Sequence, residues 1–134
     1  MPVIYSIDSE RKVIRTKCVG SVTLDEVTDH FRALERDPNC PDQLDVLLDL
    51  SELTSLPQSG QFSAVVDELK KLQDKVRLGA FAIVATRDVV FGMLRMFEVM
   101  AQRYFRVIQI FRVMSEAEAW LISERVRRER CPDG

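Results

Sequence analysis

The chain has 134 residues, of which 46% are hydrophobic and 30% are charged. This length and composition are typical of a globular protein with a hydrophobic core, and we expect a single domain over residues 1–134. The 19 basic and 21 acidic side chains leave a net charge of −2, which argues against nucleic acid as a partner.

The N-terminal segment and the cysteines exclude further classes of protein. The first residues lack the basic and apolar regions of a signal peptide, and no apolar run is long enough to span a bilayer. We therefore expect a cytoplasmic protein. Cys18, Cys40 and Cys131 lie far apart and form no CxxC or Cys/His pair, so we expect no disulfide framework, no metal site and no cofactor.

The first quarter of the chain predicts a hairpin followed by a helix. Residues 3–7 and 13–19 are rich in β-branched side chains and flank a polar segment, which predicts two antiparallel strands. Thr23 and Glu26 have the spacing of a capping box, and apolar residues then recur at helical spacing. The prolines of the turn 37–42 end this predicted helix.

The middle of the chain predicts strands that alternate with helices. The apolar runs 46–50 and 79–85 are typical of strands covered on both faces. Between them, the apolar residues of 62–76 recur at helical spacing and predict an amphipathic helix.

The last third continues this alternation. It predicts a helix over 88–104, a strand over 107–111 and a final helix that opens with a second capping box at Ser115 and Glu118. The element order is ββαβαβαβα. Because crossover helices join parallel strands, we expect an α/β superhelix on a mixed sheet, with an N-terminal antiparallel hairpin and parallel βαβ units.

The segment VLLDLSELTSLPQSG, over 46–60, resembles the signature of the STAS domains, the sulphate transporter and anti-sigma-factor antagonist family. In that family a D-L-S strand end leads through a bend to a D-S-S-G box. The residues that match are Asp49, Leu50, Ser51, Thr54, Ser59 and Gly60. Pro57 and Gln58 replace the first two residues of the box.

The second half of the chain is similar to the SpoIIAA-like branch of the STAS domains, which is related in fold to CRAL-TRIO lipid-transfer domains. The similar segments are IVATRDVVFGMLRMFE, over 83–98, and FRVMSEAEAWL, over 111–121. The resemblance implies a STAS-like fold in small proteins of mostly unassigned function, and it implies no catalytic activity.

Ser59 has two alternative interpretations. The resemblance implies a phosphorylation site, because the second Ser of the box is the phosphate acceptor in the antagonists. A phosphate there would meet the N-terminus of the next helix. However, Ser is also a preferred N-cap residue, and a capping role explains the same position without any phosphate.

The predicted helix over 88–104 is unusually apolar. On a helical wheel, a wide arc contains Val89, Val90, Met93, Leu94, Met96, Phe97, Met100, Ala101 and Tyr104. Core packing explains most of this arc. Phe91 and Val99 fall on the opposite half, beside Arg95, and suit either a ligand or a homodimer contact.

In open parallel sheets, ligands bind beyond the carboxyl ends of the strands. The corresponding loops here are 51–60 and 86–88. The predicted ligand contacts are Ser51, Thr54, Ser59, Gly60, Thr86, Arg87, Phe91 and Arg95. Gly92, at the start of the helix that walls this site, would permit close approach by the loop or by a ligand.

Catalysis has little support in the sequence, which has no GxSxG, Walker, GxGxxG or HExxH motif. His30, the single histidine, is predicted at the boundary of an apolar helix stripe, and Asp49 is predicted to bond loop N–H groups. An enzyme acting through either residue would need a cleft and a strongly perturbed pKa.

Two functions follow as hypotheses. The first is a non-catalytic binding module for a small apolar or lipid-like ligand, working at a membrane surface through peripheral contact. The alternative is a protein-interaction switch, controlled by phosphorylation of Ser59, that binds a partner protein.

Overall fold

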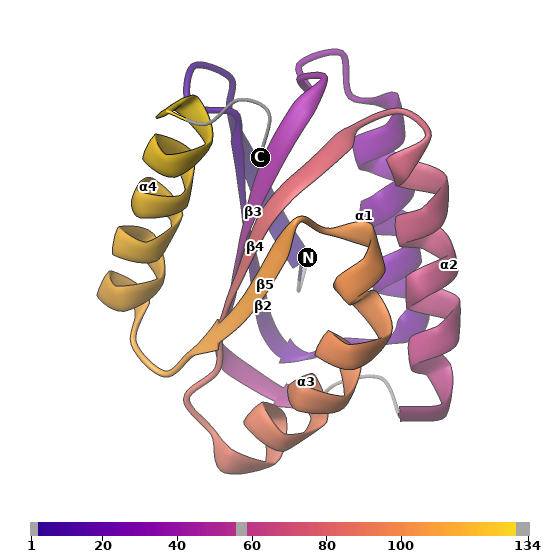
Figure 1. Cartoon of the computed structure of the whole chain (residues 1–134). Coiled ribbons are helices and arrows are strands. Elements are labelled where there is room, and N and C mark those ends of the chain that lie inside the picture. The colour runs from indigo at the N-terminus through magenta and orange to yellow at the C-terminus, as the bar shows by residue number, and fades with distance from the viewer. Residues whose placement is uncertain (1–2, 56–58, 131–134) are drawn as a thin grey trace.

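The computed structural model describes residues 3–55 and 59–130, and one five-stranded sheet lies at its centre. The strands are β1 (Val3–Asp8), β2 (Val13–Ser21), β3 (Gln43–Ser55), β4 (Arg77–Val84) and β5 (Val107–Phe111), side by side in chain order (Figure 1). β1 and β2 are antiparallel, and every other neighbouring pair is parallel. This confirms the α/β class, the N-terminal hairpin and the parallel βαβ units.

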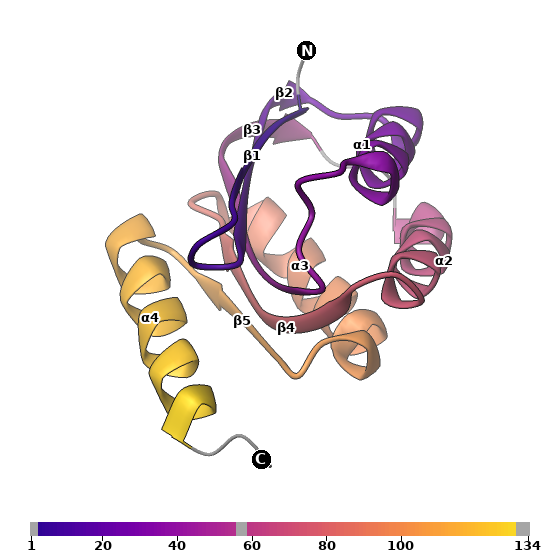
Figure 2. The same ribbon diagram turned by 90° about the horizontal axis from the view of Figure 1, so that it is seen from above.

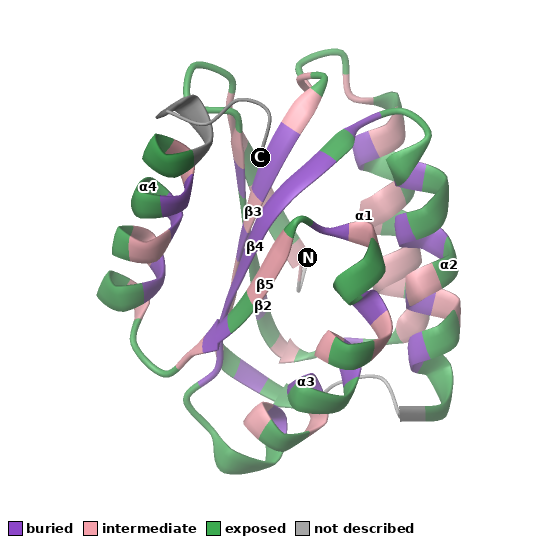
Figure 3. Cartoon of the chain, viewed as in Figure 1, coloured by how far each residue is buried: buried purple, intermediate pink, exposed green. Residues whose placement is uncertain are grey.

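Helices cover both faces of the sheet. On one face lie α1 (Leu24–Arg36), α2 (Phe62–Gln73) and α3 (Asp88–Ala101), and on the other lies α4 (Met114–Arg130), as Figures 1 and 2 show. The short 3-10 helix η1 (Ser59–Gln61) precedes α2, and η2 (Gln102–Tyr104) follows α3. Because both faces of β4 are covered, its residues 78–84 are all buried (Figure 3).

A β-bulge interrupts the pairing of β3 with β4. The register shifts between Leu44 and Val46, so that β4 has one residue more than β3 at this point. The side chain of Asp45, which is 1% exposed, accepts a hydrogen bond from the backbone N–H of Ala80 at 2.9 Å. A buried N–H that has left the strand ladder thereby keeps a partner.

Local signals fix the start of α1 as predicted. The hydroxyl of Thr23 accepts a hydrogen bond from the N–H of Glu26 at 3.3 Å, and the Glu26 carboxylate accepts one from the N–H of Thr23 at 3.0 Å. These two bonds make a complete capping box. The phenol of Tyr5 also donates a hydrogen bond to Asp37, at the C-cap of this helix, at 2.9 Å.

Two predicted helix starts are wrong. α2 begins at Phe62 with Gln61 as its N-cap, because the chain first winds through η1; Ser59 is therefore not the N-cap of the α-helix. The predicted capping box at the last helix also fails. α4 begins at Met114, so Ser115 already lies inside the helix. The side chain of Glu118 pairs instead with Arg15 of β2, at 2.8 Å.

β3 is also longer than the predicted strand 46–50. Its far end is held to β2, since Ser55 accepts a backbone hydrogen bond from Val22 at 3.2 Å. The hydroxyl groups of Ser21 and Ser55 lie 2.7 Å apart and form a second hydrogen bond. Ser51 and Thr54, predicted to lie in a loop, therefore belong to the strand.

Candidate functional site

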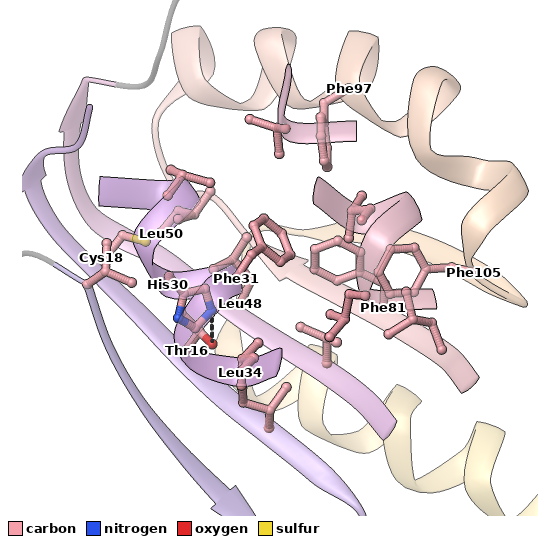
Figure 4. A pocket seen from close by; sticks show the side chains of 18 of the residues that line it. Thr16, Cys18, His30, Phe31, Leu34, Leu48, Leu50, Phe81, Phe97 and Phe105 are labelled. Carbon is pink, nitrogen blue, oxygen red and sulfur yellow. Dashed lines mark hydrogen bonds between the residues drawn. The ribbon is translucent and has the colours of Figure 1, made fainter. Parts of the chain in front are cut away.

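A cavity of about 120 Å³ lies between the sheet and the helices α1, α2 and α3. In Figure 4, labelled side chains from the sheet and from α1 and α3 surround one space. The wall includes Ile14, Thr16 and Cys18 of β2, Val46, Leu48 and Leu50 of β3, Val27, His30, Phe31 and Leu34 of α1, Val65 and Leu69 of α2, and Leu94 of α3. Almost all the surface that faces the space is apolar.

Two aromatic pairs form one part of this wall. The rings of Phe62 and Phe97 meet edge to face, with centroids 5.6 Å apart, and join α2 to α3. The rings of Phe81 and Phe105 are 4.5 Å apart and belong to β4 and to the segment before β5. These preferred pair geometries hold the four rings in place, so the aromatic part of the wall is preformed.

The cavity exists because the helices do not fill the space above the centre of the sheet. Val46 and Leu48 point toward the helices from β3, between two neighbouring strands, yet both are only half-buried. Residues at the centre of a covered sheet are normally packed at the density of an organic crystal. Their residual exposure marks the space that the side chains of α1, α2 and α3 leave open.

His30 is the titratable group of most interest in the wall. Its Nε2 lies 3.4 Å from the hydroxyl of Thr16, and its ring meets the edge of the Tyr5 ring at 5.2 Å. Its Nδ1 is buried and has no hydrogen-bond partner among the described residues. Burial lowers the pKa of His30 from 6.5 to about 4, so the imidazole is neutral at neutral pH.

Cys18, the sulfur-containing member of the wall, is unreactive in this setting. Burial, aided by the negative charges of Asp49 and Glu26, raises the pKa of its thiol to about 11. The thiolate is the nucleophilic form of cysteine, and it is scarce at neutral pH when the pKa is this high. Cys18 therefore acts as a small apolar side chain here.

The structure brings four of the predicted contacts together at the ends of β3 and β4, away from the cavity. The hydroxyl of Thr86 donates to the carbonyl of Ser51, and the guanidinium of Arg87 donates to the carbonyl of Thr54, both at 3.4 Å. Asp49 accepts bonds from the N–H and the hydroxyl of Ser51 at 2.9 and 2.7 Å, as predicted for a strand-end carboxylate.

Arg112, which was not predicted as a site residue, contacts the loop after β4 and the start of α3. Its guanidinium donates to the carbonyl of Thr86 at 3.1 Å and to the carboxylate of Asp88 at 2.7 Å. It also lies 4.2 Å from the centre of the Phe91 ring, a cation–π contact that leaves Phe91 half-buried. Arg112 directly follows β5, and the end of β5 lies beside the end of β4. This position in the sequence could have indicated that Arg112 lies near the loop after β4.

The remaining predicted contacts are dispersed. Arg95 is exposed and pairs with Glu98 one turn along α3, at 4.0 Å. Gly60 is exposed in η1, and the side chain of Ser59 lies outside the described residues. Among the seven predicted contacts other than Ser59, none is in the wall of the cavity. A Cβ at Gly92 would meet no atom within 4 Å, so no protein segment requires a glycine there.

Fewer apolar side chains of α3 are buried than the helical wheel predicted. Val90, Leu94, Phe97 and Ala101 are buried against the sheet. Val89 and Met96, which the wheel placed on the same arc, are instead 73% and 52% exposed. The buried arc is thus narrower than predicted. Met93 and Met100 are partly buried against the core, whereas Val89, Met96 and Val99 face solvent.

The described part of the chain shows neither a metal centre nor a membrane span. Over residues 3–55 and 59–130, no three His, Cys, Asp or Glu side chains are gathered as metal ligands. Within the same ranges, no helix has the length and hydropathy needed to cross a bilayer. The cavity, with its continuous apolar wall, is the candidate site that we consider further.

Comparison with known proteins supports the fold. Neither the protein-family models nor the curated proteins include a match to the chain. Among solved structures, the chain is similar to an uncharacterised protein of the DUF3478 family from Shewanella loihica PV-4, which has a SpoIIAA-like fold. The TM-score is 0.58 at 16% identity, over 89% of this chain and 91% of the other. The chain thus has a SpoIIAA-like α/β fold, as its sequence indicated.

Proposed function

We propose that this protein is a non-catalytic binding module that holds a small uncharged apolar molecule, or the apolar part of a lipid-like one, in the cavity under α1, α2 and α3. The observation behind this proposal is the wall itself, in which apolar side chains surround a space of about 120 Å³. An apolar space of roughly 150 Å³ in another protein stays dry and binds benzene, so this one suits a ligand of about one ring.

The chemistry of the wall defines the class of ligand. No Lys or Arg is among the described residues that line the cavity, and His30 is neutral because its pKa is about 4. The hydroxyl of Thr16 and Nε2 of His30 lie 3.4 Å apart and face each other, and Nδ1 of His30 is buried. A carboxylate or phosphate would therefore lose its hydration without a partner, which is costly, whereas an apolar ring gains by leaving water.

No reaction is assigned to the site. His30 has a buried Nδ1 and a pKa far below neutrality, and Cys18 has a pKa of about 11, so neither is poised for proton transfer or attack at neutral pH. The phosphorylation switch at Ser59 remains a hypothesis from the sequence, since the side chain of Ser59 lies outside the described residues.

Titration of the protein with toluene, followed by NMR of its backbone amides, tests the proposal. We expect saturable shifts centred on residues of the wall, no comparable shifts with benzoate, and loss of toluene binding in Val46→Phe, which fills the space. Ile122→Phe, at a 61% exposed position on α4, is the matched control and should bind toluene like the wild type.

A second variant keeps the proposal testable if Val46→Phe does not fold. Phe97→Ala enlarges the cavity and should admit naphthalene, a larger probe than toluene. Native mass spectrometry of gently purified protein would show whether an apolar molecule is already bound. The proposal is wrong if toluene causes no saturable shifts in the wild type and naphthalene causes none in Phe97→Ala.

A further inference from the structure

The outward face of α3 is apolar and cationic at once. Val89, Met96 and Val99 are 73%, 52% and 66% exposed, and their spacing of seven and three residues places them along one side of the helix. Gly92 lies on the same side, where a Cβ would meet no atom within 4 Å. Exposed apolar side chains are ordinary when scattered, but three in line on one helix form a candidate interaction surface.

The charges around this face are mainly positive. Arg87, Arg95, Arg103 and Arg112 lie within or beside α3, against the two carboxylates Asp88 and Glu98, which leaves an excess of two positive charges. Both carboxylates are already paired, Asp88 with Arg112 at 2.7 Å and Glu98 with Arg95 at 4.0 Å. The chain as a whole has a net charge of −2, so this region is opposite in sign to the molecule.

This combination fits one partner better than others. An interfacial helix has apolar side chains on one face and basic groups at their edge, and it lies in the plane of a membrane surface. Anionic lipid head groups attract the arginines, whose long stems allow the charge to stay at the head groups while the apolar side chains enter the acyl boundary. A protein partner would require a shaped surface, whereas Val89, Met96 and Val99 form one line of exposed side chains along a single helix.

We propose that the outward face of α3, formed by Val89, Met96 and Val99 with Arg95 and Arg103, binds an anionic lipid bilayer. The inward face of the same helix contributes Leu94 and Phe97 to the wall of the cavity, so the docked helix would separate the cavity from the bilayer. This inference extends the proposed function but does not depend on it, because lipid binding by the outward face requires no ligand in the cavity.

Co-sedimentation of the full chain with vesicles tests this surface. Vesicles of phosphatidylcholine with phosphatidylserine should bind the protein, vesicles of phosphatidylcholine alone should bind it weakly, and added salt should release it. Val99→Asp should lower binding at least about tenfold, since it removes an apolar group and adds repulsion. The pair Arg95→Gln and Arg103→Gln should lower it about fivefold for each arginine at low salt.

Ile122→Asp is the matched control, because Ile122 is 61% exposed on α4, on the other side of the sheet. This variant should bind vesicles like the wild type, and circular dichroism should show all variants folded. The proposal is overturned if the wild type does not bind anionic vesicles, or if Val99→Asp binds them as well as the wild type does. A dimer in light scattering that Val99→Asp dissociates, without vesicle binding, would instead identify the face as a contact between two copies.

Discussion

The two faces of the sheet are packed in different ways. Under α4, the sheet presents Ala80, Ala82 and Val84 to the small side chain of Ala117 and to Leu121, and all five are buried. Under α1, α2 and α3, leucine and phenylalanine side chains face one another and enclose the cavity. Small residues let a helix lie close against a sheet, whereas large ones hold helices farther away and leave gaps unless their shapes match.

This difference indicates which face is structural and which is adaptable. The α4 face is closed by ion pairs at two sides, between Arg15 and Glu118 at 2.8 Å and between Arg106 and Glu124 at 3.3 Å. The other face has a neutral wall, an Nδ1 of His30 that no described residue bonds, and half-buried residues at the centre of the sheet. We expect changes on the first face to lower stability and changes on the second face to alter ligand binding.

The largest loss of stability is expected at the bulge under α4. Asp45→Ala leaves the N–H of Ala80 buried without its acceptor, and we expect the free energy of unfolding to fall by about 3 kcal/mol. Urea denaturation followed by circular dichroism measures this loss. Asp45→Asn retains an acceptor oxygen and is the control, which should lose less. Equal stability of Asp45→Ala and the wild type would show that the bulge does not need this side chain.

The next effect tests the close packing itself. Ala82 is 0% exposed beneath α4, so Ala82→Val must displace neighbouring atoms, and we expect a loss of about 2 kcal/mol. The same denaturation experiment applies. A neutral or stabilising effect of Ala82→Val would contradict the contrast between the two faces, because it would mean that space is also available under α4.

Much of the fold was predictable because its signals are local. The β-branched runs of β1 and β2 lie within a few residues of the turn that joins them, and the capping box of Thr23 and Glu26 is contained in one helical turn. The same kind of signal failed at Ser115, where Glu118 had a tertiary partner in Arg15. Sequence spacing cannot show such competition between a local and a distant partner.

The cavity could not be predicted, since its shape depends on how side chains from β1 to β4 and from α1 to α3 pack together. Its two polar members did leave a signal. Thr16 alternates with Ile14 and Cys18 on the inward face of β2, and His30 lies one helical turn from Val27 and from Leu34. His30 was predicted only at the boundary of the apolar helix stripe, and Thr16 was not singled out, so the pair was missed. The exposure of Val89 and Met96 was not predictable, because a helical wheel does not show how much of the helix the sheet covers.

A smaller loss of stability is expected when the pH is lowered, and it comes from His30 in the wall of the cavity. The pKa of His30 is about 4 in the folded protein and 6.5 when the group is unperturbed. Below pH 6.5, His30 is therefore protonated in the unfolded chain while it stays largely neutral in the folded chain, which favours unfolding. The stability is complete above pH 6.5 and is lost as the pH falls toward 4. Between pH 7 and pH 5 we expect a loss of slightly less than about 2 kcal/mol from this group.

His30→Leu isolates this contribution, because His30 is the chain's single histidine and the two proteins share every other titratable side chain. Urea denaturation of the two proteins at pH 7 and pH 5 gives the difference. The variant should lose less stability than the wild type over this interval. Parallel losses in the two proteins would mean that His30 is as well solvated in the folded chain as in the unfolded one.

The smallest effect is expected in the cavity, and its sign is the most informative. Val46→Ile adds one methylene to a half-buried side chain that faces open space, and it keeps the β-branch that a strand favours. Because the added group fills a void instead of displacing neighbours, the protein should gain up to about 0.8 kcal/mol, the value of one buried methylene. Urea denaturation of Val46→Ile and of Ala82→Val, measured under the same conditions, compares the packing of the two faces directly. If Val46→Ile lost as much stability as Ala82→Val, both faces would be equally full, and a ligand could enter the molecule only by displacing its core.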